Sequence, residues 1–163
     1  MLVTRPSELV KHLMSKFQLR VVVTDGRGRS RPARGLVKWL STVAPKRFYG
    51  EVVVALVCDA KMRALNKRYR NLDRVTDVLS FPAEVYPHQD QSSSRVLGDI
   101  VIATGVAKRQ ARDEGVSVDM EIRRLALHGL LHVMGYDHEK DTGQMNRLER
   151  RLLRRGGMAE LTV

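Results

Sequence analysis

The chain has 163 residues, 43% of them hydrophobic and 29% charged, which excludes a disordered or fibrous protein and predicts one domain over residues 1–163. Its 29 Lys and Arg against 18 Asp and Glu give a formal net charge of +11, which attracts polyanions and favours a nucleic acid as partner. No apolar run approaches the roughly 18 residues of a membrane span, no secretory signal is recognisable, and the single Cys58 cannot form an internal disulfide, so we expect a cytoplasmic protein that contacts no membrane.

The first quarter of the chain predicts one strand and one helix after a weakly patterned start. Residues 1–17 form an N-terminal extension with room for a short helix. The β-branched run at 19–25 predicts a strand that Gly26 stops. An arginine-rich loop over 26–35 then leads into a helix near 33–43, where apolar residues recur at helical spacing.

The next segment predicts a central strand followed by an amphipathic helix. Residues 51–59 are long and apolar enough for a strand buried on both faces, and Asp59 is the expected N-cap of the helix at 60–70. One face of that helix is expected to carry its apolar residues, namely Met62, Leu65 and Tyr69.

Two further strands are expected at 77–82 and 97–103, on either side of a polar loop at 85–95. A helix follows at 104–115. The predicted fold is therefore α+β, with a small mixed sheet of about four strands on which about five helices pack.

The last third of the chain predicts two helices with recognisable ends. Ser117 or Asp119 begins a segment whose strongest helical pattern lies at 121–134, and Gly135 ends it. Asp141 or Thr142 is expected to cap a final amphipathic helix that runs to about Arg155.

Three of the five histidines lie within 11 residues, in the segment HGLLHVMGYDH at 128–138. His128 and His132 are four residues apart, which places both imidazoles on one face of the predicted helix, about one turn apart. Gly135 can adopt a left-handed conformation and reverse the chain, so His138 can return as a third ligand of one metal ion. His12 and His88 have no such companions and are expected on the surface.

An all-imidazole site of this kind favours catalysis over a structural role. Three neutral ligands leave zinc its full charge and an open position, where the pKa of a water falls to roughly 7. Metzincin proteases share the spacing HxxxHxxGxxH, but they carry a Glu after the first His as general base. This chain has Gly129 there, so peptide hydrolysis lacks its base.

Three separate blocks of the sequence together resemble the YbeY family of rRNA maturation endoribonucleases. These are the histidine segment at 128–138, LNKRYRNLDRVTDVLSFP at 65–82 and LGDIVIA at 97–103. They occur in the order and spacing of that family, over about residues 50–155. Val75 departs from the proline found there in many members, which is expected to alter only the stiffness of a loop.

The resemblance implies a zincin-like fold, one Zn²⁺ per chain, and cleavage of single-stranded RNA in the maturation of the 3′ end of 16S rRNA and in ribosome quality control. It assigns the zinc ligands to His128, His132 and His138, and it makes Arg70 important for activity. Expected partners are single-stranded RNA, the 16S rRNA precursor and the small ribosomal subunit. The predicted catalytic residues are thus Arg70 and His128.

Several roles stay open at the level of sequence. Asp77, Asp99 or Asp137 would either orient a ligand imidazole or simply cap a turn. The attacking group is either water or the ribose 2′-hydroxyl. A non-catalytic ribosome-assembly factor with a structural metal is the alternative function, and a metalloprotease is a weaker one.

Overall fold

A computed structural model describes residues 18–84 and 95–159 of the chain. The predicted succession of elements is confirmed over these residues, with boundaries that shift by one to three positions. The elements are β1 (Leu19–Asp25), α2 (Arg34–Val43), β2 (Gly50–Val57), α3 (Asp59–Arg70), β3 (Val78–Pro82), β4 (Val96–Ala103), α4 (Thr104–Asp113), α5 (Val118–Val133) and α6 (Gln144–Arg155). The expected helix within 1–17, most of the loop at 85–95, His12 and His88 lie outside the described residues.

The four strands form one mixed sheet in the order β1-β2-β4-β3. Strands β1, β2 and β4 run parallel, with Val23 opposite Val54 and Val54 opposite Ile100. The edge strand β3 is antiparallel to β4. An α+β fold with a small mixed sheet is therefore confirmed.

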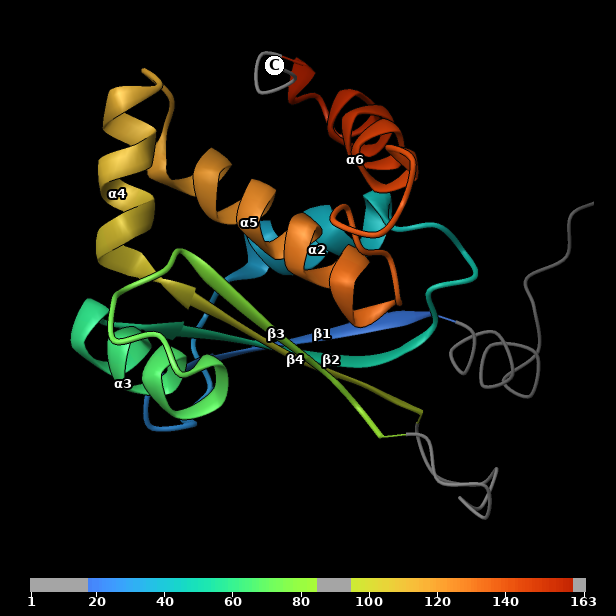
Figure 1. The fold of residues 1–163 in the computed structure, drawn as a ribbon. Coiled ribbons are helices and arrows are strands. Elements are labelled where there is room, and N and C mark those ends of the chain that lie inside the picture. The colour runs from blue at the N-terminus through green and yellow to red at the C-terminus, as the bar shows by residue number, and fades with distance from the viewer. Residues whose placement is uncertain (1–17, 85–94, 160–163) are drawn as a thin grey trace, which may run out of the picture.

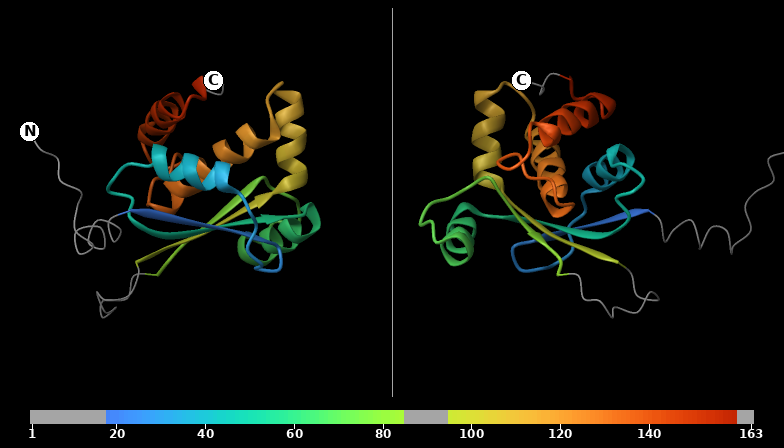
Figure 2. Two further views of the ribbon diagram at one scale, coloured as in Figure 1. Left: turned by 180° about the vertical axis from the view of Figure 1, so that it is seen from behind. Right: turned by 45° about the vertical axis from the view of Figure 1, so that its right-hand side comes forward.

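Helices cover the two faces of the sheet unequally (Figures 1 and 2). The larger core lies where α2, α5 and α6 pack over one face, and Ile100 and Ile102 of β4 point into it. The other face carries α3, where Val101 of β4 meets Met62 in a smaller core. Because both faces are covered, the central strands are mostly apolar, and only Glu51 of β2 and Asp99 of β4 interrupt them with charged residues.

Helix α5 lies unusually close to the sheet at Gly129. A Cβ atom at this position would lie 2.6 Å from Cγ2 of Ile100, nearer than side chains pack. The hydroxyl of Ser80 on β3 donates a hydrogen bond of 3.2 Å to the Gly129 carbonyl. Glycine at 129 therefore serves close packing of this helix on strands β3 and β4.

The expected cap Ser117 is present at α5, whereas Gly143 rather than Asp141 or Thr142 occupies the N-cap position of α6, with Asp141 two residues earlier. The Ser117 hydroxyl accepts a hydrogen bond from the Met120 N–H at the start of α5. The Asp141 carboxylate accepts three backbone N–H groups at the start of α6, those of Gly143, Gln144 and Met145. These side chains satisfy donors that the first helical turn leaves free.

The expected role of Asp59 is wrong. Cys58 occupies the N-cap position of α3, and Asp59 is the first helical residue. The Asp59 carboxylate instead accepts the Val106 N–H and the Arg109 guanidinium of α4. It therefore caps a helix that begins 45 positions later in the chain, a tertiary contact that local sequence does not reveal.

No helix among residues 18–84 and 95–159 has the length and apolar character needed to cross a membrane.

The close approach at Gly129 generates a test of the packing. We expect Gly129→Ala to lower the free energy of unfolding by about 1–3 kcal/mol, because overpacking against Ile100 outweighs the better helix propensity of alanine. In the Gly129→Ala/Ile100→Ala double variant the loss should be smaller than the sum of the single losses. Urea denaturation measures both quantities. Gly35→Ala in α2, where the new Cβ meets only the flexible end of Arg123, is the control and should be near neutral.

Candidate metal centre

His128 and His132 lie on the same face of the last two turns of α5, as their spacing predicts. Their ring centroids are 4.8 Å apart. The two Nε2 atoms are 3.2 Å apart, so both rings present the same nitrogen to a shared point.

Gly135 reverses the chain directly after α5. Its φ of +88° is left-handed, a conformation that only glycine adopts without strain. The Gly135 N–H donates to the His132 carbonyl and the Tyr136 N–H donates to the Leu131 carbonyl, which together form a Schellman motif. The helix end is therefore closed by backbone hydrogen bonds before the segment that carries His138.

This reversal brings His138 to the other two histidines. The His138 ring centroid is 5.5 Å from that of His128 and 5.2 Å from that of His132. One ligand nitrogen from each of the three residues lies within 4.8 Å of the other two. The expected convergence of His128, His132 and His138 is therefore present.

Asp137 shapes the turn that presents His138. Its carboxylate accepts the Glu139 N–H and pairs with Lys140 at 3.0 Å. Its carbonyl accepts the N–H groups of Lys140 and Asp141. Asp137 thus stabilises a turn, the second of the two roles considered for it.

The other two candidate carboxylates do not orient an imidazole. Asp77 accepts the Val78 N–H and the Gln110 side-chain amide, whereas Asp99 is exposed on β4. Within the described parts of the chain, neither is hydrogen-bonded to a histidine. Asp77 directly precedes β3, as expected for a strand beginning, but Asp99 lies within β4 rather than at its start.

Glu149 of α6 is the carboxylate that orients a histidine, and the sequence analysis missed it. Its oxygens lie 3.2 and 3.3 Å from Nδ1 of His128, and its side chain is only 13% exposed. A carboxylate at Nδ1 holds the proton there, which leaves the Nε2 lone pair free for a metal. The available signal was that Glu149 is the only acid of α6 and adjoins the buried Leu148.

The geometry of the three imidazoles fits one metal ion. Zn–N bonds of about 2.0–2.1 Å in a tetrahedral site place ligand nitrogens about 3.3 Å apart. The observed separation of the His128 and His132 Nε2 atoms is 3.2 Å. Burial lowers the pKa of His132 below its ordinary value of 6.5, and charge on His128 and His138 lowers it further. This shift favours the neutral imidazole, the form that binds a metal.

On the same face of α5 as the histidines, but closer to its N-terminus, lies a buried ion pair. Glu121 is fully buried, and both its oxygens bind the guanidinium of Arg124, one turn before His128. The pair anchors the helix that carries two of the three histidines, because a buried carboxylate requires its partner to stay in place.

Arg70 lies apart from the histidines. It is the exposed last residue of α3, on the opposite face of the sheet from α5 (Figure 1). Its side chain makes no hydrogen bond or ion pair with any residue in 18–84 or 95–159. The structure therefore leaves its guanidinium free for a ligand but does not bring it into direct contact with the three imidazoles.

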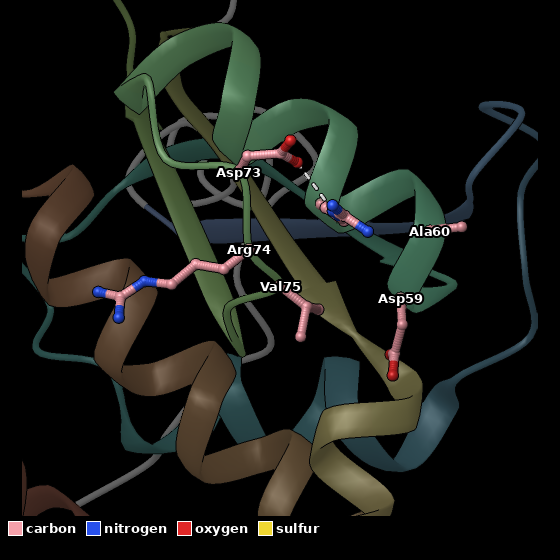
Figure 3. Close-up of a pocket in the computed structure, with 6 residues that line it drawn as sticks. Asp59, Ala60, Asp73, Arg74 and Val75 are labelled. Carbon is pink, nitrogen blue, oxygen red and sulfur yellow. Dashed lines mark hydrogen bonds and ion pairs between the residues drawn. The ribbon is translucent and has the colours of Figure 1, made fainter.

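Two surface cavities were considered as alternative sites. The first, of about 470 Å³, lies at α3 and the loop that follows it (Figure 3). Its acids are engaged, since Asp59 pairs with Arg109 and Asp73 with Arg63 and Lys67. The second, of about 360 Å³, lies against Gly135–Asp137, next to the turn that presents His138. Neither contains a histidine, so the three-histidine group is the stronger candidate for chemistry.

Comparisons with known proteins agree on one group of relatives. A family model described as Endoribonuclease YbeY matches residues 31–157. The Endoribonuclease YbeY of Nautilia profundicola is 45% identical over 105 residues, which cover 64% of this chain and 71% of that protein. The Endoribonuclease YbeY of Myxococcus xanthus is 39% identical over 155 residues, which cover 93% of this chain and 52% of that protein.

A solved structure supports the fold. The solution structure of TM1509 from Thermotoga maritima superimposes with a TM-score of 0.58 over 83% of this chain and 88% of that chain. At 23% sequence identity, this likeness bears on the fold alone.

The contact between Glu149 and His128 predicts a specific loss of metal affinity. We expect Glu149→Ala to weaken metal binding about 10- to 100-fold, because His128 loses the partner that fixes its tautomer and ring orientation. Glu149→Gln should lose less, since its amide oxygen can still accept the bond. Competition with a chromogenic chelator measures the affinity. Glu114→Gln, an exposed glutamate at the end of α4, is the control, and equal affinity in all variants would contradict the assigned role.

The lowered pKa of His132 predicts how the metal-free protein responds to acid. Just below pH 6.5 the unfolded chain binds more protons at this residue than the folded one, so the free energy of unfolding falls as the pH drops through that range. Denaturant titrations of chelator-treated protein above and below pH 6.5 measure the change. His132→Gln should show a weaker pH dependence over the same interval. A stability that rises on acidification there would refute the expectation.

Proposed function

Because the chain belongs to the endoribonuclease YbeY family, we propose that it is a zinc-dependent endoribonuclease specific for single-stranded RNA. The observation that carries the proposal is the convergence of three imidazole nitrogens within 4.8 Å, with a carboxylate behind the first. Such a site has three protein ligands and room for substrate, which is the pattern of catalytic rather than structural zinc.

In this proposal, His128, His132 and His138 hold one Zn²⁺ per chain. When bound, zinc stabilises negative charge on the phosphate and lowers the pKa of water. An all-imidazole donor set favours zinc over magnesium, calcium or manganese, which prefer oxygen ligands. Glu149 keeps the proton of His128 at Nδ1, so that Nε2 faces the metal.

Arg70 is proposed to bind the phosphate that is cleaved. A guanidinium can donate two parallel hydrogen bonds to phosphate oxygens and keeps its charge at any relevant pH. Arg70 is exposed and makes no ion pair with a described residue, which supports its availability to RNA. Because it lies beyond the edge of the sheet from the histidines, the RNA backbone itself would connect the two.

Two routes of cleavage remain compatible with these residues. Either water or the ribose 2′-hydroxyl attacks the phosphorus. The 5′-hydroxyl and 2′,3′-cyclic phosphate ends of the second route distinguish it from direct attack by water.

The biological substrate that we propose is the 16S rRNA precursor on the small ribosomal subunit, where cleavage matures the 3′ end and serves ribosome quality control. The net charge of +11 supports a polyanionic partner of this kind. This substrate places the protein in the cytoplasm, and we treat residues 1–163 as one catalytic domain.

Two other functions are disfavoured by particular observations. A ribosome-assembly factor with a structural metal would normally close the metal site with a fourth protein ligand, whereas the group found among the described residues has three. A metalloprotease needs a glutamate after the first histidine. Gly129 occupies that position and is packed so tightly against Ile100 that a larger side chain does not fit.

Cleavage of single-stranded RNA should require the metal centre. We expect His128→Ala, and separately treatment of the wild type with a chelator, to reduce cleavage of a labelled single-stranded RNA by at least about 100-fold. Zinc should restore the chelated wild type but not the variant. Gel analysis of the products measures both, and circular dichroism checks that the variant is folded.

Wild-type cleavage rates in folded His128→Ala would overturn the catalytic role of the site. Arg70→Glu in the same assay should lower kcat with little change in thermal stability, because Arg70 is exposed. Unchanged kcat in that variant would remove Arg70 from the proposal and leave the metal centre standing.

A further inference from the structure

Tyr69 does not lie where its helical spacing places it. The pattern of α3 groups it with Met62 and Leu65 on one inward face, yet Met62 is fully buried and Tyr69 is 56% exposed. It has the largest exposed fraction among the large hydrophobic side chains that the structure describes. An aromatic ring that is largely exposed at the end of a helix contributes little to the core, so packing does not account for a tyrosine at this position.

The exposed ring is nevertheless held in place. Phe81 of β3 meets it nearly edge-on, with ring centroids 5.0 Å apart and an interplanar angle of 69°. The Arg68 guanidinium carbon lies 5.5 Å from the Tyr69 ring centroid. The ring is therefore preorganised beside a cation rather than free to rotate in solvent.

Arg68 lies beside this ring, and Arg70 and Arg74 follow it closely in the chain. Earlier on α3, Arg63 and Lys67 both form ion pairs with Asp73. By contrast, the exposed side chains of Arg68, Arg70 and Arg74 make no ion pair with a residue in the described ranges. The Arg74 side chain projects away from Asp73 (Figure 3). Positive charge interleaved with an aromatic ring is the pattern of surfaces that bind single-stranded nucleic acid.

A short path of contacts leads from Tyr69 to the metal centre. Phe81 contacts the Tyr69 ring, and its chain neighbour Ser80 donates a hydrogen bond to the carbonyl of Gly129. Gly129 directly follows His128. Only the edge strand β3 thus separates the exposed ring from the helical turn that carries the first histidine, and β3 has no strand beyond it in the sheet.

We propose that Tyr69, together with Arg68, is a stacking site for one unpaired nucleobase of the RNA that reaches the metal centre across β3. This inference rests on the proposed function and deepens it. A base can stack on the tyrosine ring or on the planar guanidinium, while Arg70 and Arg74 meet the flanking phosphates. Bases inside a duplex have their faces covered by neighbouring pairs, so the site selects for single strands.

Binding to metal-free protein separates this site from the cleavage chemistry. We expect Tyr69→Leu to weaken binding of a fluorescein-labelled single-stranded RNA about 5- to 150-fold, the range measured for loss of one base–aromatic stack. Tyr69→Phe should bind like the wild type, because it keeps the ring. Leucine retains apolar contact with Phe81, and thermal melting confirms that the variant is folded. Fluorescence anisotropy in chelator and at fixed salt measures the affinities.

Two controls make the assay specific. Tyr49→Ala removes a tyrosine that also has an arginine over its ring, Arg95 at 4.7 Å, in the segment that leads into β2. It should not affect binding, and an equal loss in Tyr49→Ala and Tyr69→Leu would overturn the proposal. A blunt RNA duplex should bind equally to wild type and Tyr69→Leu, whereas an equal loss of duplex affinity would also overturn it.

Oligonucleotides with one abasic position complete the test. At the position that stacks on Tyr69, the abasic substitution should weaken binding by the wild type but not by Tyr69→Leu. If every abasic oligonucleotide affects the two proteins equally, no base stacks there and the inference is wrong. If the wild type cleaves RNA and the Tyr69→Leu variant binds RNA as tightly as the wild type, the stacking site is refuted but the proposed function is not. Wild type that neither binds nor cleaves single-stranded RNA would refute the proposed function and the stacking site together.

Discussion

The hydrogen bond between Nδ1 of His128 and Glu149 is the contact on which the candidate metal centre depends. Two imidazole nitrogens can lie 3.2 Å apart only if at least one of them carries no proton and has a free lone pair. The Glu149 carboxylate holds the proton of His128 at Nδ1, so Nε2 is the nitrogen of His128 with the free lone pair. The bond also joins α5 to α6. The fold of the C-terminal third and the chemistry of the site therefore depend on the same interaction.

The close packing of α5 on the sheet fixes the position of the metal centre relative to strands β3 and β4. Gly129 allows the helix to approach Ile100 without a side chain between them, and the Ser80 hydroxyl joins the helix to the edge strand. The metal centre and the exposed end of α3 consequently lie on the two sides of β3. A single strand of RNA that follows this edge would meet cations and an aromatic ring before it meets the histidines.

The distribution of ion pairs shows where the excess positive charge of +11 is exposed. Many acids are engaged in structural roles: Asp141 caps α6, Asp59 caps α4, Asp137 stabilises a turn, and Glu149 holds His128. Of these four acids, only Asp59 forms an ion pair with an arginine among the described residues, Arg109. In α6 the only acid points toward His128, so the outward side chains Arg150, Arg151, Arg154 and Arg155 make no ion pair with a described residue. The positive field therefore persists around the site and can concentrate RNA there.

The sequence by itself determined whatever depends on local spacing. The order of strands and helices follows from short β-branched or apolar runs and from apolar residues at helical spacing, and His128 and His132 share a face because they are four residues apart. Gly135 indicates that the chain reverses after α5 and brings His138 back to the other histidines, because this reversal needs a residue with left-handed backbone conformation. The resemblance to YbeY proteins rests on the same local blocks, and the family match agrees with it.

Only the tertiary structure decided which distant side chains meet. Glu149 is separated from His128 by 21 positions, and Asp59 reaches a helix beyond two further strands, so neither contact leaves a local pattern. Tyr69 has the spacing of a core residue, but only the earlier turns of α3 are buried against the sheet, and in the last turn Tyr69 touches Phe81 of β3 while more than half of its side chain stays exposed. The spacing of apolar residues shows which side chains share one face of a helix. Whether each of those side chains is buried depends on how far along the helix the neighbouring sheet extends.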